Sequence, residues 1–115
     1  MKILHRSIYE IDAGEMREIV YLLEPIETAD GRGGFDVTYK SPVAVFALVH
    51  PGGNVRELQE ANLTYDNIIT IYMRYNDSLT EGWKINYRGD IYTLHKSSDV
   101  DAKKRFLQIS AYTKA

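Results

Sequence analysis

Residues Trp83 to Lys96 read Trp-Lys-Ile-Asn-Tyr-Arg-Gly-Asp-Ile-Tyr-Thr-Leu-His-Lys, and they contain two short strands with a turn between them. Apolar and polar side chains alternate from Trp83 to Tyr87 and again from Ile91 to Lys96, which is the period of a strand with one buried face. Arg88-Gly89-Asp90 separates the two runs, and glycine supplies the positive φ that a tight turn needs. This stretch therefore predicts a tight β-hairpin.

Four further runs are typical of strands because they are rich in β-branched, aromatic and aliphatic residues. Arg17 to Glu24 is stopped by Pro25, and Ile68 to Tyr75 shows the clearest alternation of a half-buried strand. Val43 to Val49 is apolar on both faces, so we expect it in the core, central to a barrel or covered by a partner. Arg105 to Tyr112 is the expected last strand.

One segment, Asn54 to Asn62, has the features of a short helix. Asn54 can cap the first turn and Glu57, three residues later, can reach back to it. Short strands, one helix and no βαβ spacing predict a mainly β fold, a small barrel of about six strands or a rolled antiparallel sheet. A long Gly-rich connection between strands completes this expected fold.

That connection lies between Pro25 and Pro42 and has three glycines in four positions, Gly31, Gly33 and Gly34. Glycine permits positive φ and chain mobility, while Phe35, Val37 and Tyr39 alternate as in a short strand. The segment is typical of an extended hairpin or a flexible loop. Connections of this length are uncommon in compact domains unless they have a function or are disordered, so we expect a role beyond folding here.

The 115 residues are enough for one domain, which we place at residues 17–115. Residues 1–16 contain apolar residues without a sustained period, and Ala13-Gly14 marks a break, so we interpret them as an N-terminal arm. No stretch approaches the roughly 20 apolar residues of a membrane span, nor is there a signal-peptide pattern. These features predict synthesis in the cytosol and no membrane partner.

The formal net charge is −2, from 14 basic and 16 acidic residues that are interspersed along the chain. Tight binding to DNA phosphates needs a concentrated basic surface, so we expect any contact with DNA to be weak. Nine of the aromatic residues are tyrosines. Tyrosine is enriched both at interfaces and in strands, so this observation leaves both explanations open.

Residue patterns for catalysis or metal binding are missing from the sequence. It has no cysteine, and its three histidines, His5, His50 and His95, are too far apart for a short metal-ligand motif. Gly31-Arg-Gly-Gly34 lacks the Lys-Ser/Thr and the helix of a phosphate loop, and Ser97, His95 and Asp99 have no nucleophile-elbow context. We therefore expect no catalytic residue, no metal and no cofactor.

A nucleic-acid-binding barrel is an alternative interpretation. Basic residues are interleaved with aromatic residues that could stack on bases: Lys84, Arg88, Arg74 and 103–105 with Trp83, Tyr75, Tyr87 and Tyr92. The same strands carry acidic residues, which weakens this hypothesis.

Four stretches, in order, resemble the phage head-tail connector or head-tail joining family, which includes stopper-type head-completion proteins. Gly14 to Pro25 is similar to the family's opening strand that ends at Pro, and Gly31 to Lys40 is similar to its Gly-rich loop and following strand. Val45 to Asn62 resembles its Phe-Ala-x-Val strand, Pro turn and short helix. Ile71 to Tyr75, with Trp83 to Tyr92, resembles its Arg-Tyr and Tyr-x-Gly-x-x-Tyr signature. The length of the N-terminal arm and Trp83, where the family often has a smaller residue, depart from the pattern.

The resemblance implies a non-enzymatic virion protein that joins a DNA-filled head to the tail. Members form a ring, commonly a dodecamer, below the portal and adaptor proteins and above tail proteins, and the isolated subunit can be a monomer. Duplex DNA passes through the ring without being held tightly. The implied location is the head-tail neck of a phage or prophage particle assembled in the bacterial cytoplasm. A tail-completion or minor virion protein on a similar barrel is the alternative within this class.

In stopper members a long inter-strand loop reaches toward the channel and helps to retain DNA. Carried onto this chain, the resemblance implies a channel loop formed by the following residues: Asp30, Gly31, Arg32, Gly33, Gly34, Phe35 and Asp36. Tyrosine and arginine are frequent anchors of protein interfaces, so they are the candidates for contacts around the ring. The candidate ring-interface residues are Tyr39, Arg56, Tyr72, Arg74, Tyr87 and Arg88.

Overall fold

A computed structural model describes residues 13–53, 59, 67–100 and 102–113. It contains a short 3-10 helix, η2 (Ala13–Glu15), and eight strands within these ranges. The strands are β1 (Glu18–Leu23), β2 (Pro25–Ala29), β3 (Phe35–Tyr39), β4 (Val43–Pro51), β5 (Ile68–Arg74), β6 (Lys84–Tyr87), β7 (Asp90–Asp99) and β8 (Phe106–Tyr112).

Six of the strands form a closed barrel in the order β1-β4-β5-β8-β7-β6, and the other two, β2 and β3, form a separate two-stranded sheet. Each pairing is antiparallel. Closure leaves no free edge on the barrel. The predicted mainly β fold with a six-stranded barrel is confirmed.

The core follows from the alternation along the strands. Its largest fully buried side chains are Ile71, Ile85, Leu94, Ile109 and Val20, from five different strands. No polar or charged residue is buried among those that the structure describes. Since inward positions are apolar all round the barrel, the core forms by burial of one face of every strand.

The sequence between Trp83 and Lys96 forms the expected hairpin of β6 and β7. Arg88 and Gly89 have φ values of 53° and 88°, so both central residues adopt the left-handed conformation of a two-residue turn. Asn86 Oδ1 accepts a hydrogen bond from Gly89 N at 3.1 Å and closes the turn.

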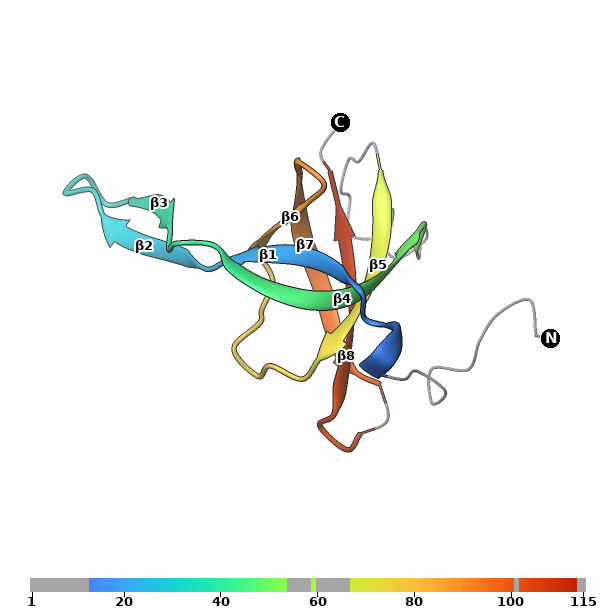
Figure 1. Cartoon of the computed structure of the whole chain (residues 1–115). Helices are drawn as coiled ribbons and strands as arrows, with labels where there is room; N and C mark the ends of the chain where they lie inside the picture. Colours follow the sequence, from blue (N-terminus) through green and yellow to red (C-terminus); the bar gives the residue numbers. More distant parts are fainter. Residues whose placement is uncertain (1–12, 54–58, 60–66, 101, 114–115) are drawn as a thin grey trace.

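β1 continues into β2, and β3 continues into β4, so the four strands form one long ribbon that leaves the barrel (Figure 1). Leu22 pairs with Val43 in the barrel, whereas Pro25 pairs with Tyr39 beyond it. The chain advances by three residues from Leu22 to Pro25 but by four from Tyr39 to Val43. The segment that joins β3 to β4 therefore has one extra residue, near Ser41. An extra residue of this kind bends and twists a ribbon. Because the ribbon leaves the barrel, the molecule is elongated, with extents of 56 × 28 × 28 Å.

Three expectations about the elements were wrong in detail. Pro25 does not end the strand region but begins β2, a position that suits proline because its missing N–H is not needed at the first residue of an edge strand. The second strand of the predicted hairpin does not end at Lys96, because β7 extends to Asp99. Val43 to Val49 is not buried on both faces, since Phe46 on its outer side is 64% exposed.

Two expected features lie largely outside the described residues. The helix from Asn54 to Asn62 lies outside the described residues except for Gln59, which is helical. Residues 1–12 of the expected N-terminal arm also lie outside them, while Met16, at its end, is buried against the barrel.

Candidate functional site

The segment that projects from the barrel is the first candidate for a functional site. It consists of β2, β3 and the tip between them, residues 25–39, which we call the projecting hairpin (Figure 1). β2 and β3 pair only with each other among the described strands, and every residue of β3 is exposed. Folding of the barrel core does not account for this hairpin, because none of its side chains is buried there.

The tip of the hairpin, residues 30–34, is organised by one carboxylate. Asp30 Oδ1 accepts hydrogen bonds from Arg32 N at 2.7 Å and from Gly34 N at 3.1 Å, and Asp30 N donates to Gly34 O at 3.1 Å. Gly31 and Gly33 have φ values of 80° and 86°, which other residues adopt only with strain. Of the two structures expected for this segment, an extended hairpin and a flexible loop, the structure shows the hairpin, with a short, hydrogen-bonded tip.

The two faces of the projecting hairpin differ in polarity. Directly paired residues lie on the same face of an antiparallel ribbon, and the pairs Ala29–Phe35, Glu27–Val37 and Pro25–Tyr39 alternate with the pairs Thr28–Asp36 and Ile26–Thr38. The first three pairs form a mostly apolar face, on which Phe35 is 65% exposed. The second face is mostly polar. A hairpin with one exposed apolar face is a candidate for contact with another protein.

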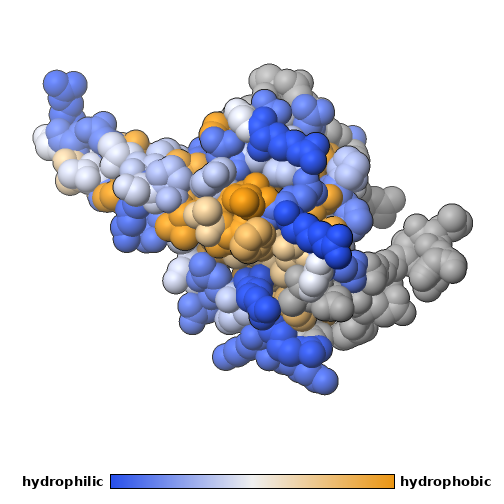
Figure 2. All heavy atoms as spheres, viewed as in Figure 1, coloured by the Kyte–Doolittle hydropathy of each residue, from blue (hydrophilic) through white to orange (hydrophobic). Residues whose placement is uncertain are grey.

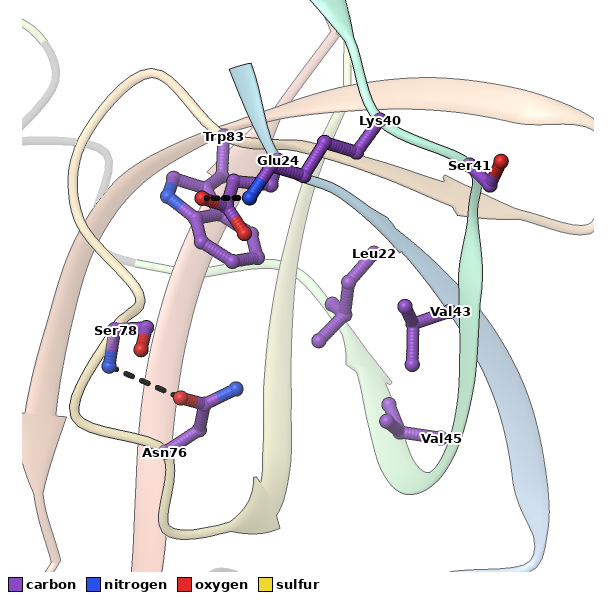
Figure 3. Close-up of a pocket in the computed structure, with 9 residues that line it drawn as sticks. All are labelled: Leu22, Glu24, Lys40, Ser41, Val43, Val45, Asn76, Ser78 and Trp83. Atoms are coloured by element: carbon purple, nitrogen blue, oxygen red, sulfur yellow. Dashed lines mark hydrogen bonds and ion pairs between the residues drawn. The ribbon is translucent and has the colours of Figure 1, made fainter. Parts of the chain in front are cut away.

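The root of the hairpin, where it meets the barrel, is held by Glu24 and Lys40. The Lys40 ammonium lies 3.1 Å from Glu24 Oε2, and Lys40 N donates to Glu24 O at 2.9 Å. Behind this pair lies a cavity of about 590 Å³ at the end of the barrel, and Figure 3 shows its apolar wall. The residues that line it are Leu22, Glu24, Lys40, Ser41, Val43, Val45, Asn76, Ser78 and Trp83.

A second exposed apolar surface lies on the outside of the barrel, where β1 and β4 pair. Ile19 pairs with Phe46 and Tyr21 pairs with Ala44, and all four side chains point outward. We call these four residues the barrel patch. Apolar residues gather on this face over β1 and β4 (Figure 2). Beside the patch is an open groove of about 580 Å³, lined by Val45, Phe46, Met73, Arg74, Tyr75, Asn76 and Asp77.

The candidate ring-interface residues fall in three places. Tyr39 lies on the apolar face of the projecting hairpin. Tyr72 and Arg74 lie on the outer side of β5, where Tyr72 pairs with Leu48 of β4 and Arg74 lines the groove beside Phe46. Tyr87 and Arg88 lie together at the β6–β7 turn. Arg56 lies outside the described residues.

Tyr87 and Arg88 take part in a cluster within the subunit. The Tyr87 hydroxyl donates to Glu18 Oε1 at 2.5 Å, and Arg88 Nη2 donates to the same oxygen at 2.8 Å. The Arg88 guanidinium also lies 5.1 Å from the centre of the Tyr87 ring. Burial, followed by the hydrogen bond to Glu18, raises the pKa of Tyr87. This cluster explains the positions of both residues by contacts inside one chain, and their role between subunits stays a prediction.

Two of the four aromatic residues that could have formed a base-stacking face are buried. Trp83 is 8% exposed and Tyr92 is 6% exposed, and both belong to the barrel core. Rings that are packed in a core cannot stack on nucleotide bases. The burial of these two rings weakens the interpretation of the chain as a nucleic-acid-binding barrel.

Within the described ranges, no group of three or more His, Asp or Glu side chains could hold a metal ion. The described part of the chain also contains no helix that is long and apolar enough to cross a membrane.

The sequence did not reveal the barrel patch or the apolar face of the hairpin. Val43 to Val49 was interpreted as core because its apolar residues occupy both faces. Residues 19–23 are all apolar, so the sequence does not show that Ile19 and Tyr21 lie on the outer face. The alternation of Phe35, Val37 and Tyr39 was a usable signal for the hairpin face, because every residue between those three is polar.

Solved structures of other proteins share this fold, among them the following two. One, from the virion of a native gene transfer agent particle, has a TM-score of 0.65 and 16% identity, covering 86% of this chain and 94% of its own. The other, the solution structure of a protein from Shigella flexneri 2a, has a TM-score of 0.66 and 17% identity, covering 91% of this chain and 98% of its own. At such identities the likeness concerns the fold. No curated protein sequence matches the chain.

A family model matches most of the sequence. The model describes the phage head completion protein, and it matches residues 11–114, which include the whole barrel and the projecting hairpin. The resemblance found in the four sequence stretches is thereby confirmed. The chain belongs to the phage head completion protein family, whose members are structural proteins of the virion and not enzymes.

Proposed function

We propose that this head completion protein forms a ring in the neck of the particle, below the portal and adaptor proteins and above the tail. We further propose that the tip of its projecting hairpin reaches toward the channel and helps to retain packaged DNA. Family membership supports the role in joining head and tail. The observation that supports the channel role is the projecting hairpin, which extends beyond the barrel core and ends in a Gly-rich tip.

The shape of the hairpin suits a channel element. Its length of five residues in each strand corresponds to roughly 17 Å of reach from the root, at about 3.3 Å per residue. The hydrogen bonds of Asp30 define its resting shape, and the nearby glycines allow the tip to change path when the channel opens. A subunit barrel can then hold its place in the ring while only the tip moves.

The charge of the hairpin suits a surface that DNA must slide past. Asp30 and Asp36 lie at or beside the tip, with Arg32 between them. Carboxylates repel phosphates, and a single arginine gives few of the contacts from which strong DNA binding arises. Retention in this proposal therefore comes from a physical obstruction of the channel and not from affinity for DNA.

The channel role is tested by shortening the tip. Replacing residues 30–34 by Asn-Gly keeps the Ala29–Phe35 pair and closes the hairpin with a two-residue turn. Particles assembled with this variant should contain the protein but lose DNA before tail joining, measured as DNA content per purified head. Arg32→Ala is the control, since it keeps the length and removes only the charge, and it should retain DNA. Heads that stay full with the shortened tip would contradict the channel role.

A further inference from the structure

We propose that the apolar face of the projecting hairpin of one subunit packs against the barrel patch of a second copy of this chain. The hairpin would thus be an intersubunit strap, in addition to carrying the tip. The inference rests on the proposed ring, and it names the surfaces that join neighbours within it.

The hairpin has a surface that needs a partner. A two-stranded ribbon alone is marginally stable in water, because it has too little apolar surface to bury. Phe35, Val37 and Tyr39 lie in a row on one face and are 65%, 49% and 38% exposed. An exposed row of this kind on a projecting element is typical of a binding surface. Burial of these side chains would stabilise both the hairpin and the contact.

The barrel offers a matching surface. Phe46 is 64% exposed and Ile19 46%, and they are direct cross-strand partners, so their side chains form one continuous apolar area. Tyr21, 43% exposed, extends this area toward the root of the hairpin. The groove beside Phe46 gives the patch a concave border that can receive a side chain from outside. Neither surface is covered by another described element of the same chain.

Charge also pairs these two surfaces. Between Glu24 and Lys40 the chain has four carboxylates and two basic residues, so the hairpin is acidic. Glu27 lies in the middle of its apolar face beside Val37, and no ion pair or hydrogen bond to it is found among the described residues. Arg74 is exposed beside Phe46 and likewise has no such partner within the described part of the chain. We pair Glu27 of one copy with Arg74 of the next.

The second copy, and not the same chain, is the occupant that the geometry favours. The ribbon carries the hairpin away from the barrel, so its apolar face and the barrel patch of one subunit lie along different parts of an elongated molecule (Figure 1). Two different complementary surfaces on one chain give a head-to-tail contact, which closes into a ring when the rotation between neighbours permits. A closed ring uses every hairpin and every patch.

The absence of cysteine from the sequence makes this contact directly testable. The paired variant Val37→Cys/Phe46→Cys puts one thiol on each surface, and particles containing it would be treated with a short bismaleimide. We expect a ladder of covalent multimers of the protein that extends beyond the dimer. Thr38→Cys/Phe46→Cys is the matched control, because Thr38 lies on the opposite face of the same strand, and it should give no ladder.

A second test exchanges the charges. Glu27→Arg and Arg74→Glu should each reduce incorporation of the protein into particles, and the double variant should restore it. Thr28→Arg, on the opposite face of the hairpin, is the control and should leave incorporation unchanged.

The outcomes separate this inference from the proposed function. Incorporated protein that gives no ladder, a ladder that stops at the dimer, or a product that joins this chain to a different virion protein would each overturn the hairpin-to-barrel contact and leave the joining role intact. Particles that join heads to tails without containing the protein would overturn both proposals.

Discussion

At the scale of single residues, the carboxylate of Glu18 makes hydrogen bonds that join two distant parts of the barrel. It comes from β1, yet its carboxylate accepts from both Tyr87 and Arg88 at the β6–β7 turn. Tyr87 and Arg88 are about 70 residues from Glu18 in the sequence, so these hydrogen bonds connect β1 to the turn between β6 and β7. A contact of this kind stabilises the closure of the barrel between β1 and β6.

The first prediction concerns this carboxylate. Glu18→Ala leaves the Tyr87 hydroxyl without its acceptor, and we expect the free energy of unfolding to fall by about 1 kcal/mol, the usual value for one hydrogen bond. The exposed Arg88 should add little to this loss. Urea denaturation followed by tryptophan fluorescence measures it. Glu27→Ala is the control, since Glu27 is exposed on the hairpin, and an equal loss in both variants would contradict the assigned role of Glu18.

At the scale of elements, the projecting hairpin and the barrel are separable. The barrel core contains no residue from β2 or β3, and the root is already closed by the hydrogen bond from Lys40 N to Glu24 O. If two residues replaced the chain between Glu24 and Lys40, the same hydrogen bond would close a two-residue β-turn. The barrel therefore provides the fold, and in our proposal the hairpin acts through contacts outside its own subunit.

The second prediction follows from this separation. Replacing residues 25–39 by Asn-Gly should leave a folded barrel whose free energy of unfolding is unchanged or slightly higher, because shortening a loop lowers its closure entropy by roughly 0.6 kcal/mol per halving. Circular dichroism and urea denaturation would measure this, while particle assembly with the same variant should fail. Loss of cooperative unfolding would show that the hairpin is part of the folding unit.

At the scale of the whole molecule, tyrosines contribute a dependence of stability on pH. Burial is the first cause that raises the pKa of Tyr72, Tyr87, Tyr92 and Tyr112, and nearby carboxylates add to it for the last three. A raised pKa means that the folded state keeps the proton at a pH where the unfolded state has lost it. The contribution of these tyrosines to stability is therefore fully present below about pH 10 and is lost as the pH rises beyond it.

The third prediction tests this alkaline loss. The free energy of unfolding should decrease as the pH rises above about 10, measured by urea denaturation at each pH. Tyr112→Phe removes the hydroxyl of a buried ring at the C-terminal end of β8, so the decrease should be smaller in that variant. Identical pH profiles for the two proteins would exclude Tyr112 from the effect.

Much of the fold could be predicted from the sequence, because strand periodicity is a local property. The alternation in 68–75 and 83–96 was sufficient for β5, β6 and β7, and Arg88-Gly89 was sufficient for their turn. β2 was not assigned, because Pro25 was interpreted as an end and Ile26 to Ala29 is too short and too polar to form a strand by itself. Its pairing with β3 makes it one.

For the candidate site, too, some features could be predicted from the sequence and others only from the tertiary structure. By itself, the sequence determined a mainly β fold, a Gly-rich segment between two of its strands, and membership of a virion protein family, whereas the choice between a barrel and a rolled sheet stayed open. Only the tertiary structure decided that Trp83 and Tyr92 face the core while Phe46 and Ile19 face outward. The physical reason is that alternation determines which residues share a face of a strand, whereas the neighbouring strands determine which of two apolar faces is enclosed when the barrel closes.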